Sequence, residues 1–182
     1  STVSVTGLHI PLTVLLIGIV LRGASCAFQH PGVPFDERLP WGSLFAVGSL
    51  VAPFWLGVVL GSVAAGLPPS SGSFLTRYVE PWLAPFPLAV GVFTTVLALY
   101  LAAAYLKVEA QDGELQVEFR LRAIAAGIVA AGLEETLLLL SREAAPLVWG
   151  GLTGTVWGVL AQFTTAVAGL TGIACLWLKR FR

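Results

Sequence analysis

The sequence contains few charged residues, two cysteines, two histidines and no methionine. Its ten basic and ten acidic side chains make up 11% of 182 residues, so charge gives no reason to expect a nucleic-acid partner. Cys26 and Cys175 lie far apart without CxxC spacing, which argues against a disulfide framework or a zinc cluster. The chain begins with Ser1, and we expect it to be a piece of a longer polypeptide.

Apolar residues, by contrast, are abundant: they make up 57% of the sequence, and the mean hydropathy is +0.87. This composition is typical of the membrane class. A spanning helix needs about 20 apolar residues to cross roughly 30 Å of hydrocarbon. We therefore predict an all-α polytopic membrane helical bundle, a single integral membrane domain over residues 1–182, with five spans near 8–28, 44–67, 86–106, 123–140 and 155–178. The apolar, glycine-rich segment 146–154 is interpreted as interfacial or re-entrant.

The basic residues of the short loops predict the orientation, because lysine and arginine are retained on the cytoplasmic side. With five spans, Arg77 and Arg142 fall on one side of the membrane. The other side, which we predict to be cytoplasmic and to include the C-terminus, carries Arg38, Lys107, Arg120, Arg122, Lys179, Arg180 and Arg182.

Arg22 is a charged residue inside the first span, about six residues or roughly 9 Å from the end of that span at Phe28. Its long side chain can lift the guanidinium to the lipid headgroups. Alternatively, the guanidinium forms an ion pair or contacts a lipid, a quinone or a haem propionate inside a subunit interface, since intramembrane charges usually face protein. Both interpretations stay open.

Glu134 and Glu135 interrupt the fourth span, about 17 Å beyond Ala123. An ionised carboxylate at that depth is costly, so each should be protonated, paired or beside water. Adjacent residues on a helix point about 100° apart, so the two cannot face the same partner. A proton relay is one hypothesis. The other is a shorter helix with an amphipathic segment at the outer interface.

Gly57 and Gly61 lie four residues apart in the second span, and small residues at this spacing let another helix approach closely. We predict that they are helix-packing positions. His9 and His30 flank the first span at opposite membrane faces, and a membrane haem needs a histidine within a bundle. We therefore expect no metal or haem bound by this chain alone, and no catalytic residue.

Several motifs of the sequence occur together in one known membrane family. The segment LRGASCAF, residues 21–28, is similar to an LRG-x-x-F-E-F motif, and with the positions given below it resembles subunit II of cytochrome bd-type quinol oxidases, in order and spacing, over roughly residues 8–125. The family's first two helices, with their acidic DG and WDG motifs, have no match here, so the chain is either a fragment or a short, diverged member. The further matching positions are Trp41-Gly42, FAVGSLVAPFWLGVVLG, Gly66, Pro85-Phe86-x-Leu88, Gly91, Gly113-Glu114-Leu115, Arg120 and Arg122-Ala123.

The resemblance implies a haem-free accessory subunit of a membrane quinol:oxygen oxidoreductase in a bacterial or archaeal cytoplasmic membrane. The expected partners are a haem-bearing subunit I, which would hold haem b and haem d, membrane lipid and quinol or quinone. Of the charged family positions, Arg22 carries over, without the acid that the family usually has two residues after the Cys26 position. The alternatives are a small transporter or channel component, in which Glu134, Glu135 and Gln162 line a polar path, and a structural membrane scaffold.

Overall fold

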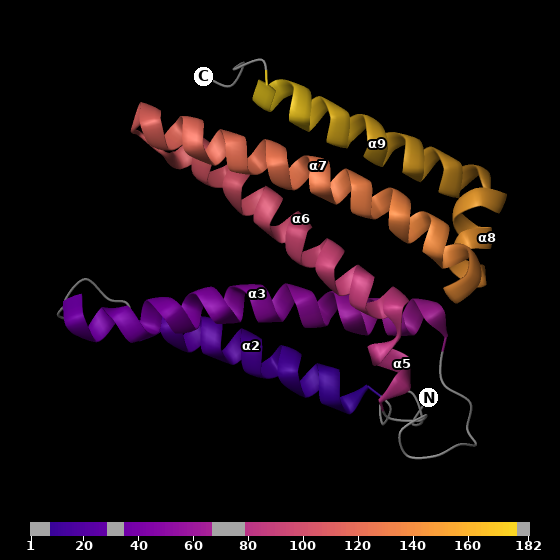
Figure 1. Ribbon diagram of the computed structural model, residues 1–182, viewed down its shortest axis with the longest axis horizontal. Coiled ribbons are helices and arrows are strands. Elements are labelled where there is room, and N and C mark those ends of the chain that lie inside the picture. The colour runs from indigo at the N-terminus through magenta and orange to yellow at the C-terminus, as the bar shows by residue number, and fades with distance from the viewer. Residues whose placement is uncertain (1–7, 29–34, 67–78, 178–182) are drawn as a thin grey trace. The chain divides into compact units, whose positions relative to one another are not determined.

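The computed structural model describes residues 8–28, 35–66 and 79–177, and every element in these ranges is a helix (Figure 1). Five of the helices are long and apolar enough to cross a membrane. The prediction of an all-α membrane bundle with five spans is therefore confirmed. In chain order the helices are α2 (His9–Phe28), α3 (Phe35–Ala65), α5 (Glu80–Leu83), α6 (Pro85–Glu109), α7 (Gly113–Ala144), α8 (Pro146–Gly154) and α9 (Val156–Trp177).

Helix α7 begins ten residues earlier than its apolar span predicted, at Gly113 rather than near residue 123. Asp112 explains this start, because its extended backbone and its carboxylate cap the first turn, with the Glu114 amide donating to Asp112 Oδ1 over 3.2 Å. Pro146 ends the helix, since proline disfavours the helical conformation in the residue before it. That residue, Ala145, has φ −141° and ψ 65°.

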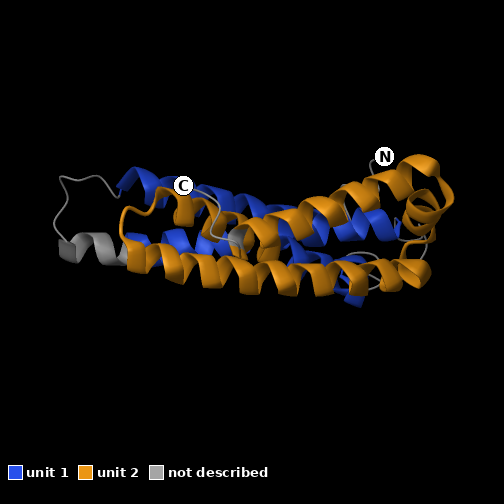
Figure 2. Ribbon diagram, turned by 90° about the horizontal axis from the view of Figure 1, so that it is seen from above, with its two compact units in different colours: residues 1–94 blue, residues 95–182 orange. Residues whose placement is uncertain are grey.

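The chain divides into two compact units, residues 1–94 and 95–182, with the division inside α6 (Figure 2). Each unit is described by itself below. The expectation of one integral membrane domain stays a prediction.

In the first unit, α2 and α3 run side by side (Figure 1) and pack through glycines. A Cβ atom added to Gly48 would lie 2.9 Å from the Gly18 carbonyl oxygen and 3.0 Å from the Arg22 amide nitrogen. A Cβ at Gly18 would lie 3.2 Å from the Ala52 amide nitrogen. The two backbones therefore approach as closely as they do because neither glycine carries a side chain.

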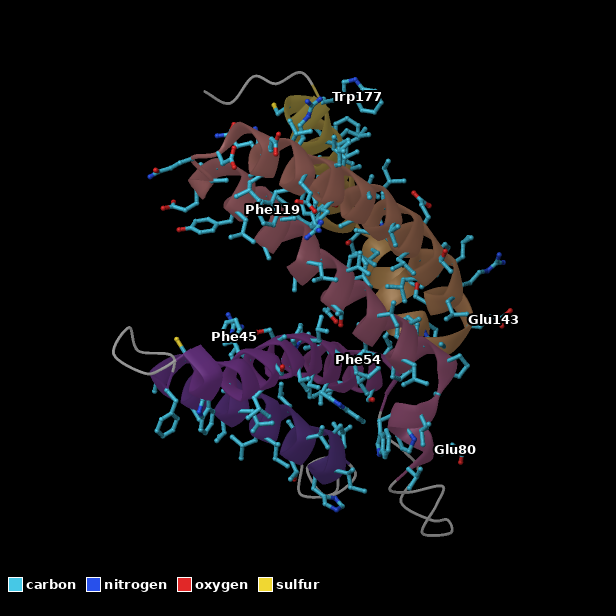
Figure 3. All side chains as sticks on the ribbon, turned by 60° about the vertical axis from the view of Figure 1, so that its left-hand side comes forward. Phe45, Phe54, Glu80, Phe119, Glu143 and Trp177 are labelled. Atoms are coloured by element: carbon cyan, nitrogen blue, oxygen red, sulfur yellow. The ribbon has the colours of Figure 1, made fainter. Side chains whose placement is uncertain are left out.

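Gly57 and Gly61 lie where α3 meets the first turns of α6. A Cβ atom on Gly57 would lie 2.6 Å from the Val90 carbonyl oxygen and 2.8 Å from the Gly91 Cα, and it would also collide with the Thr94 hydroxyl. A Cβ on Gly61 would lie 2.7 Å from the Pro87 Cα. Gly91 is equally tight against Phe54 of α3, which is labelled in Figure 3. The crossing is thus a contact of backbone on backbone.

The second unit places the Tyr100 side chain of α6 between α7 and α9. A Cβ atom on Gly127 of α7 would lie 3.2 Å from the Tyr100 ring, and one on Gly172 of α9 would lie 2.7 Å from its hydroxyl oxygen. One turn along α6, buried Ala103 packs against fully buried Ala123. The Tyr100 side chain thus occupies space that is free because Gly127 and Gly172 carry no side chains.

The threonines of α9 direct their hydroxyl groups inward to their own helix. The hydroxyls of Thr164, Thr165 and Thr171 donate to backbone carbonyls three or four residues earlier, over 2.5–3.1 Å. Each of these side chains therefore satisfies its polar group without a partner from another helix.

Replacing Gly57 by alanine should destabilise the protein by about 1–3 kcal/mol, because the methyl group forces α3 and α6 apart and overpacked contacts cost that much. Leucine at Gly57 or Gly61 should have a larger effect and weaken assembly. The thermal unfolding midpoint of the detergent-solubilised protein measures the change.

The matched control is Gly132→Ala in α7, where a Cβ atom would meet nothing within 4 Å. Alanine there should leave stability unchanged or raise it by about 0.5–1 kcal/mol, since glycine is a poor helix former. Equal midpoints for the two variants would contradict the close contact at Gly57.

Candidate functional site

Arg22 lies in the last two turns of α2, with an exposed side chain. Its guanidinium carbon is 5.8 Å from the centroid of the Phe45 ring of α3, which Figure 3 labels. This distance allows a cation–π attraction to the face of the ring. Among the side chains that the structure describes, within residues 8–28, 41–66 and 79–177, no carboxylate forms an ion pair with Arg22.

Aromatic rings continue beyond Arg22 toward the end of the α2–α3 hairpin. Phe28 stacks on Trp41 with ring centroids 4.6 Å apart and an interplanar angle of 23°. Arg22 is thus held from one side by aromatic and backbone contacts, while the rest of its side chain is exposed. The arrangement leaves the donors of the guanidinium able to bind an anionic group from outside the chain.

Helix α7 runs unbroken through Glu134 and Glu135 to Ala144, and both glutamate side chains are exposed. The helix is therefore not shortened before these residues. The two carboxyl groups lie on different faces, as their spacing requires.

Glu134 lies on the packing stripe of α7, the helix face that carries Ala123, Gly127, Ala130 and Ser141. All four are buried. Glu134 comes eleven positions after Ala123, so its side chain leaves the helix within about 20° of the direction of Ala123. Glu134 therefore interrupts a stripe that is buried on both sides of it along the helix. A carboxyl group there faces protein neighbours when the stripe is covered.

Glu135 lies about 100° away, on the face that carries Leu121, Ile128 and Leu139. All three are exposed large apolar residues, and this face of α7 is therefore suited to lipid. The carboxyl group of Glu134 thus lies on a packing face of α7, and that of Glu135 lies among exposed apolar side chains.

Gln162 of α9 shares a helix face with Gly158 and Ile173, and its Nε2 atom is buried without a hydrogen-bond partner. A Cβ atom on Gly127 of α7 would lie 3.2 Å from Ile173 of α9. Because α7 and α9 run antiparallel, Gln162, eleven residues before Ile173, lies level with Leu138, eleven residues after Gly127. Leu138 is about one turn past Glu134 along α7. No hydrogen bond joins Gln162 to either glutamate. Gln162 thus lies near the level of Glu134, but no hydrogen bond links the three polar side chains into one path.

Arg120 has a role that the sequence did not indicate. Its Nη2 atom donates to the carbonyl oxygen of Trp177, 57 residues away at the end of α9, over 2.6 Å. A cation at the C-terminal end of a helix is favoured by the helix dipole and satisfies an unpaired carbonyl. The neighbouring Arg122 instead pairs with Glu118 one turn earlier on the exposed surface.

The described residues contain no group of three His, Cys, Asp or Glu side chains that could hold a metal ion. His9 is exposed in the first turn of α2. His30, Arg77 and the basic residues Lys179, Arg180 and Arg182 lie outside the described ranges, and the side chain of Arg38 is not described.

Comparison with known proteins gives two findings. A family model described as cytochrome bd terminal oxidase subunit II matches residues 1–181. A curated protein, cytochrome bd ubiquinol oxidase subunit 2 of Bacillus subtilis (strain 168), is 25% identical over 92 residues, which are 50% of this chain and 27% of that protein. The match therefore covers about a quarter of the relative's length. The family match extends well past residue 125, where the motif resemblance ended.

Proposed function

The chain belongs to the cytochrome bd terminal oxidase subunit II family, as its motifs predicted, and from this membership we propose that it is the haem-free accessory subunit of a membrane quinol:oxygen oxidoreductase. A subunit II implies a partner subunit I in the complex. The observation that carries the proposal is the family match over residues 1–181, together with five membrane-length apolar helices. In this role the chain supports the haem-bearing subunit in respiratory electron transfer and proton access.

The histidine and methionine content of this chain supports the proposal that it ligates no haem. A membrane haem commonly takes an axial histidine from within a bundle, often opposed by a second histidine or a methionine. Methionine does not occur in the sequence, and His9 is exposed in the first turn of its helix. This supports the assignment of haem b and haem d, and of the chemistry that they supply, to subunit I. Quinol is the expected electron donor of the complex, and quinone is its oxidised product.

The proposed location is a bacterial or archaeal cytoplasmic membrane, with the C-terminus in the cytoplasm. The seven basic residues on one side of the five spans, against two on the other, support this orientation. The polar first turns of α7, which carry Arg120 and Arg122, would then lie on the cytoplasmic side.

The function is tested by purifying the tagged protein gently from its native membrane and recording a reduced-minus-oxidised visible spectrum. We expect bands of b- and d-type haems in proportion to the tagged chain, because the partner subunit travels with it. A flat spectrum from an intact preparation would overturn the oxidase assignment and favour the transporter alternative.

Arg22 is proposed to bind an anionic group at the interface with subunit I. Its side chain is exposed, lies over Phe45 and has no carboxylate partner among the described side chains. A carboxylate of the partner, a haem propionate, a quinone oxygen and a lipid phosphate share the acceptor chemistry that the guanidinium fork binds. The competing interpretation is a side chain that only extends to the headgroups.

Replacing Arg22 by lysine separates these interpretations. Lysine extends to the headgroups as well as arginine does, but it lacks the planar fork and stacks less well on an aromatic ring. We expect both Arg22→Lys and Arg22→Leu to lower the yield of haem-containing complex, by about tenfold for leucine, because losing one partner of a buried charge pair is costly.

The control is Arg142→Leu, which removes an exposed arginine from the last turn of α7 and should leave the yield unchanged. Full recovery of the complex with Arg22→Lys would assign Arg22 to the headgroups instead.

Glu134, rather than Glu135, is proposed to carry protons toward the haem-bearing subunit. Its place on the packing stripe of α7 supports this, because a carboxyl covered by protein can be given polar neighbours or water, whereas Glu135 lies among exposed leucine and isoleucine side chains. Its neutral and ionised forms would alternate as a proton passes.

Glu134→Gln should therefore slow quinol-driven oxygen consumption by about a hundredfold or more, because a proton-transfer group typically contributes about 10²–10⁴-fold to a rate. The rate is measured across a range of pH in the assembled oxidase. Glu135→Gln serves as the matched variant and should keep both the rate and the pH profile. An unchanged rate and pH profile in Glu134→Gln would assign that residue a structural role.

A further inference from the structure

Helix α8 is a short apolar helix between two membrane-length helices. Its nine residues, Pro146–Gly154, rise about 13 Å, which is less than half of the hydrocarbon thickness. The charge-free run that contains it extends from Ala144 to Leu178. Figure 1 shows α8 joining the end of α7 to the beginning of α9. A segment of this composition is a poor aqueous loop and is too short to be a span.

Two hydrogen bonds of the Thr155 side chain hold the α8–α9 corner, residues 146–160, together from within. The Thr155 hydroxyl donates to the Gly151 carbonyl oxygen over 2.5 Å and accepts from the Gly158 amide over 3.1 Å. A Cβ atom on Gly158 would lie 2.7 Å from the Leu152 carbonyl oxygen, so the two helices touch through their backbones. A chain reversal can enter an apolar medium when its polar groups are paired in this way.

The outer surface of the α8–α9 corner is strongly apolar. Leu147 is 87% exposed and Trp157 is 82% exposed, and Val156 is exposed beside them. An open cavity of about 330 Å³ lies at the junction of the two helices, lined by Thr153, Gly154, Thr155, Val156, Val159 and Leu160. The hydroxyls of both threonines donate to their own backbone, over 2.7 Å from Thr153, so the lining offers few polar groups to a ligand. Exposing this surface to water would cost a free energy of about 25 cal/mol per Å² of apolar area.

Two neighbouring features indicate what covers this surface. Arg142 and Glu143, the last charged residues before the corner, are exposed at the end of α7, where Figure 3 labels Glu143, and mark the level of the lipid headgroups. Farther along α9, Leu160 and Phe163 are also exposed, on the same helix face as Val156. Acyl chains are as apolar as leucine, so a surface of this composition is stable against them.

We propose that the α8–α9 corner is a lipid-binding surface on which α8 lies in the plane of the membrane interface. Phospholipid acyl chains cover Leu147 and Val156 and enter the cavity, while Trp157 lies at the interface, where amphipathic rings are favoured. The bound lipid fixes the depth at which the α7–α9 pair sits in the bilayer.

A bimane fluorophore on a single cysteine tests this proposal in native membranes. The two native cysteines are replaced by serine, and the label is attached at Leu147→Cys. Quenching by phospholipids brominated on their acyl chains is compared with quenching by aqueous iodide. The lipid reference is Leu139→Cys, 68% exposed on α7, and the aqueous reference is Val117→Cys in the polar first turns of α7.

We expect bromolipid quenching at Leu147→Cys within about twofold of Leu139→Cys, and iodide quenching at least about fivefold below that of Val117→Cys, because an interfacial helix buries its apolar face in lipid. Dominant iodide quenching would show an aqueous loop, and weak quenching by both reagents would show a protein partner covering the corner. Either result overturns the proposal. The haem spectrum of the same membranes reports separately on the oxidase role.

Discussion

The structure depends on close backbone contact between helices. Lipid tails are as apolar as leucine, so helices in a membrane gain little from the hydrophobic effect when they associate, and they rely on packing at short range. Gly18 and Gly48 supply this contact between α2 and α3, and Gly57, Gly61 and Gly91 supply it between α3 and α6. In the second unit, Gly127 and Gly172 instead make room for the Tyr100 side chain. The large apolar residues are left to face outward.

The membrane also constrains where charged side chains can lie and what they must contact. Arg120 is bound by the last described carbonyl of α9, and Arg122 by Glu118 on the exposed first turns of α7. Arg22 and Glu134 differ, since one lies over an aromatic ring and the other interrupts a buried stripe without a charged partner in the described part of the chain. Uncompensated charges within spans are expensive in isolation. They are therefore consistent with a subunit that is completed by another chain, as family membership implies.

The number and type of the spans could be predicted because length and hydropathy decide them in a membrane. The early start of α7 could not be predicted, because residues 113–122, GELQVEFRLR, alternate polar and apolar residues as a strand does. The structure shows that Asp112 caps a helix at this point. The spacing of Gly57 and Gly61 indicated a packing face but not the residues that meet it, which come from another helix. The sequence separated the directions of Glu134 and Glu135 without telling which one faces its neighbours. The bond from Arg120 to Trp177 joins positions 57 residues apart and had no local signal.

The internally bonded threonines of α9 bear on how this helix enters the membrane during synthesis. The most apolar 18-residue window of α9 has a lower mean hydropathy than those of the other four candidate spans, and residue scales count its threonines as polar. In the folded helix, the hydroxyls of Thr164, Thr165 and Thr171 donate to backbone carbonyls, so these polar groups need no further partner in the membrane. The free energy of inserting α9 into the bilayer should therefore be more favourable than its composition suggests, once the helix has formed.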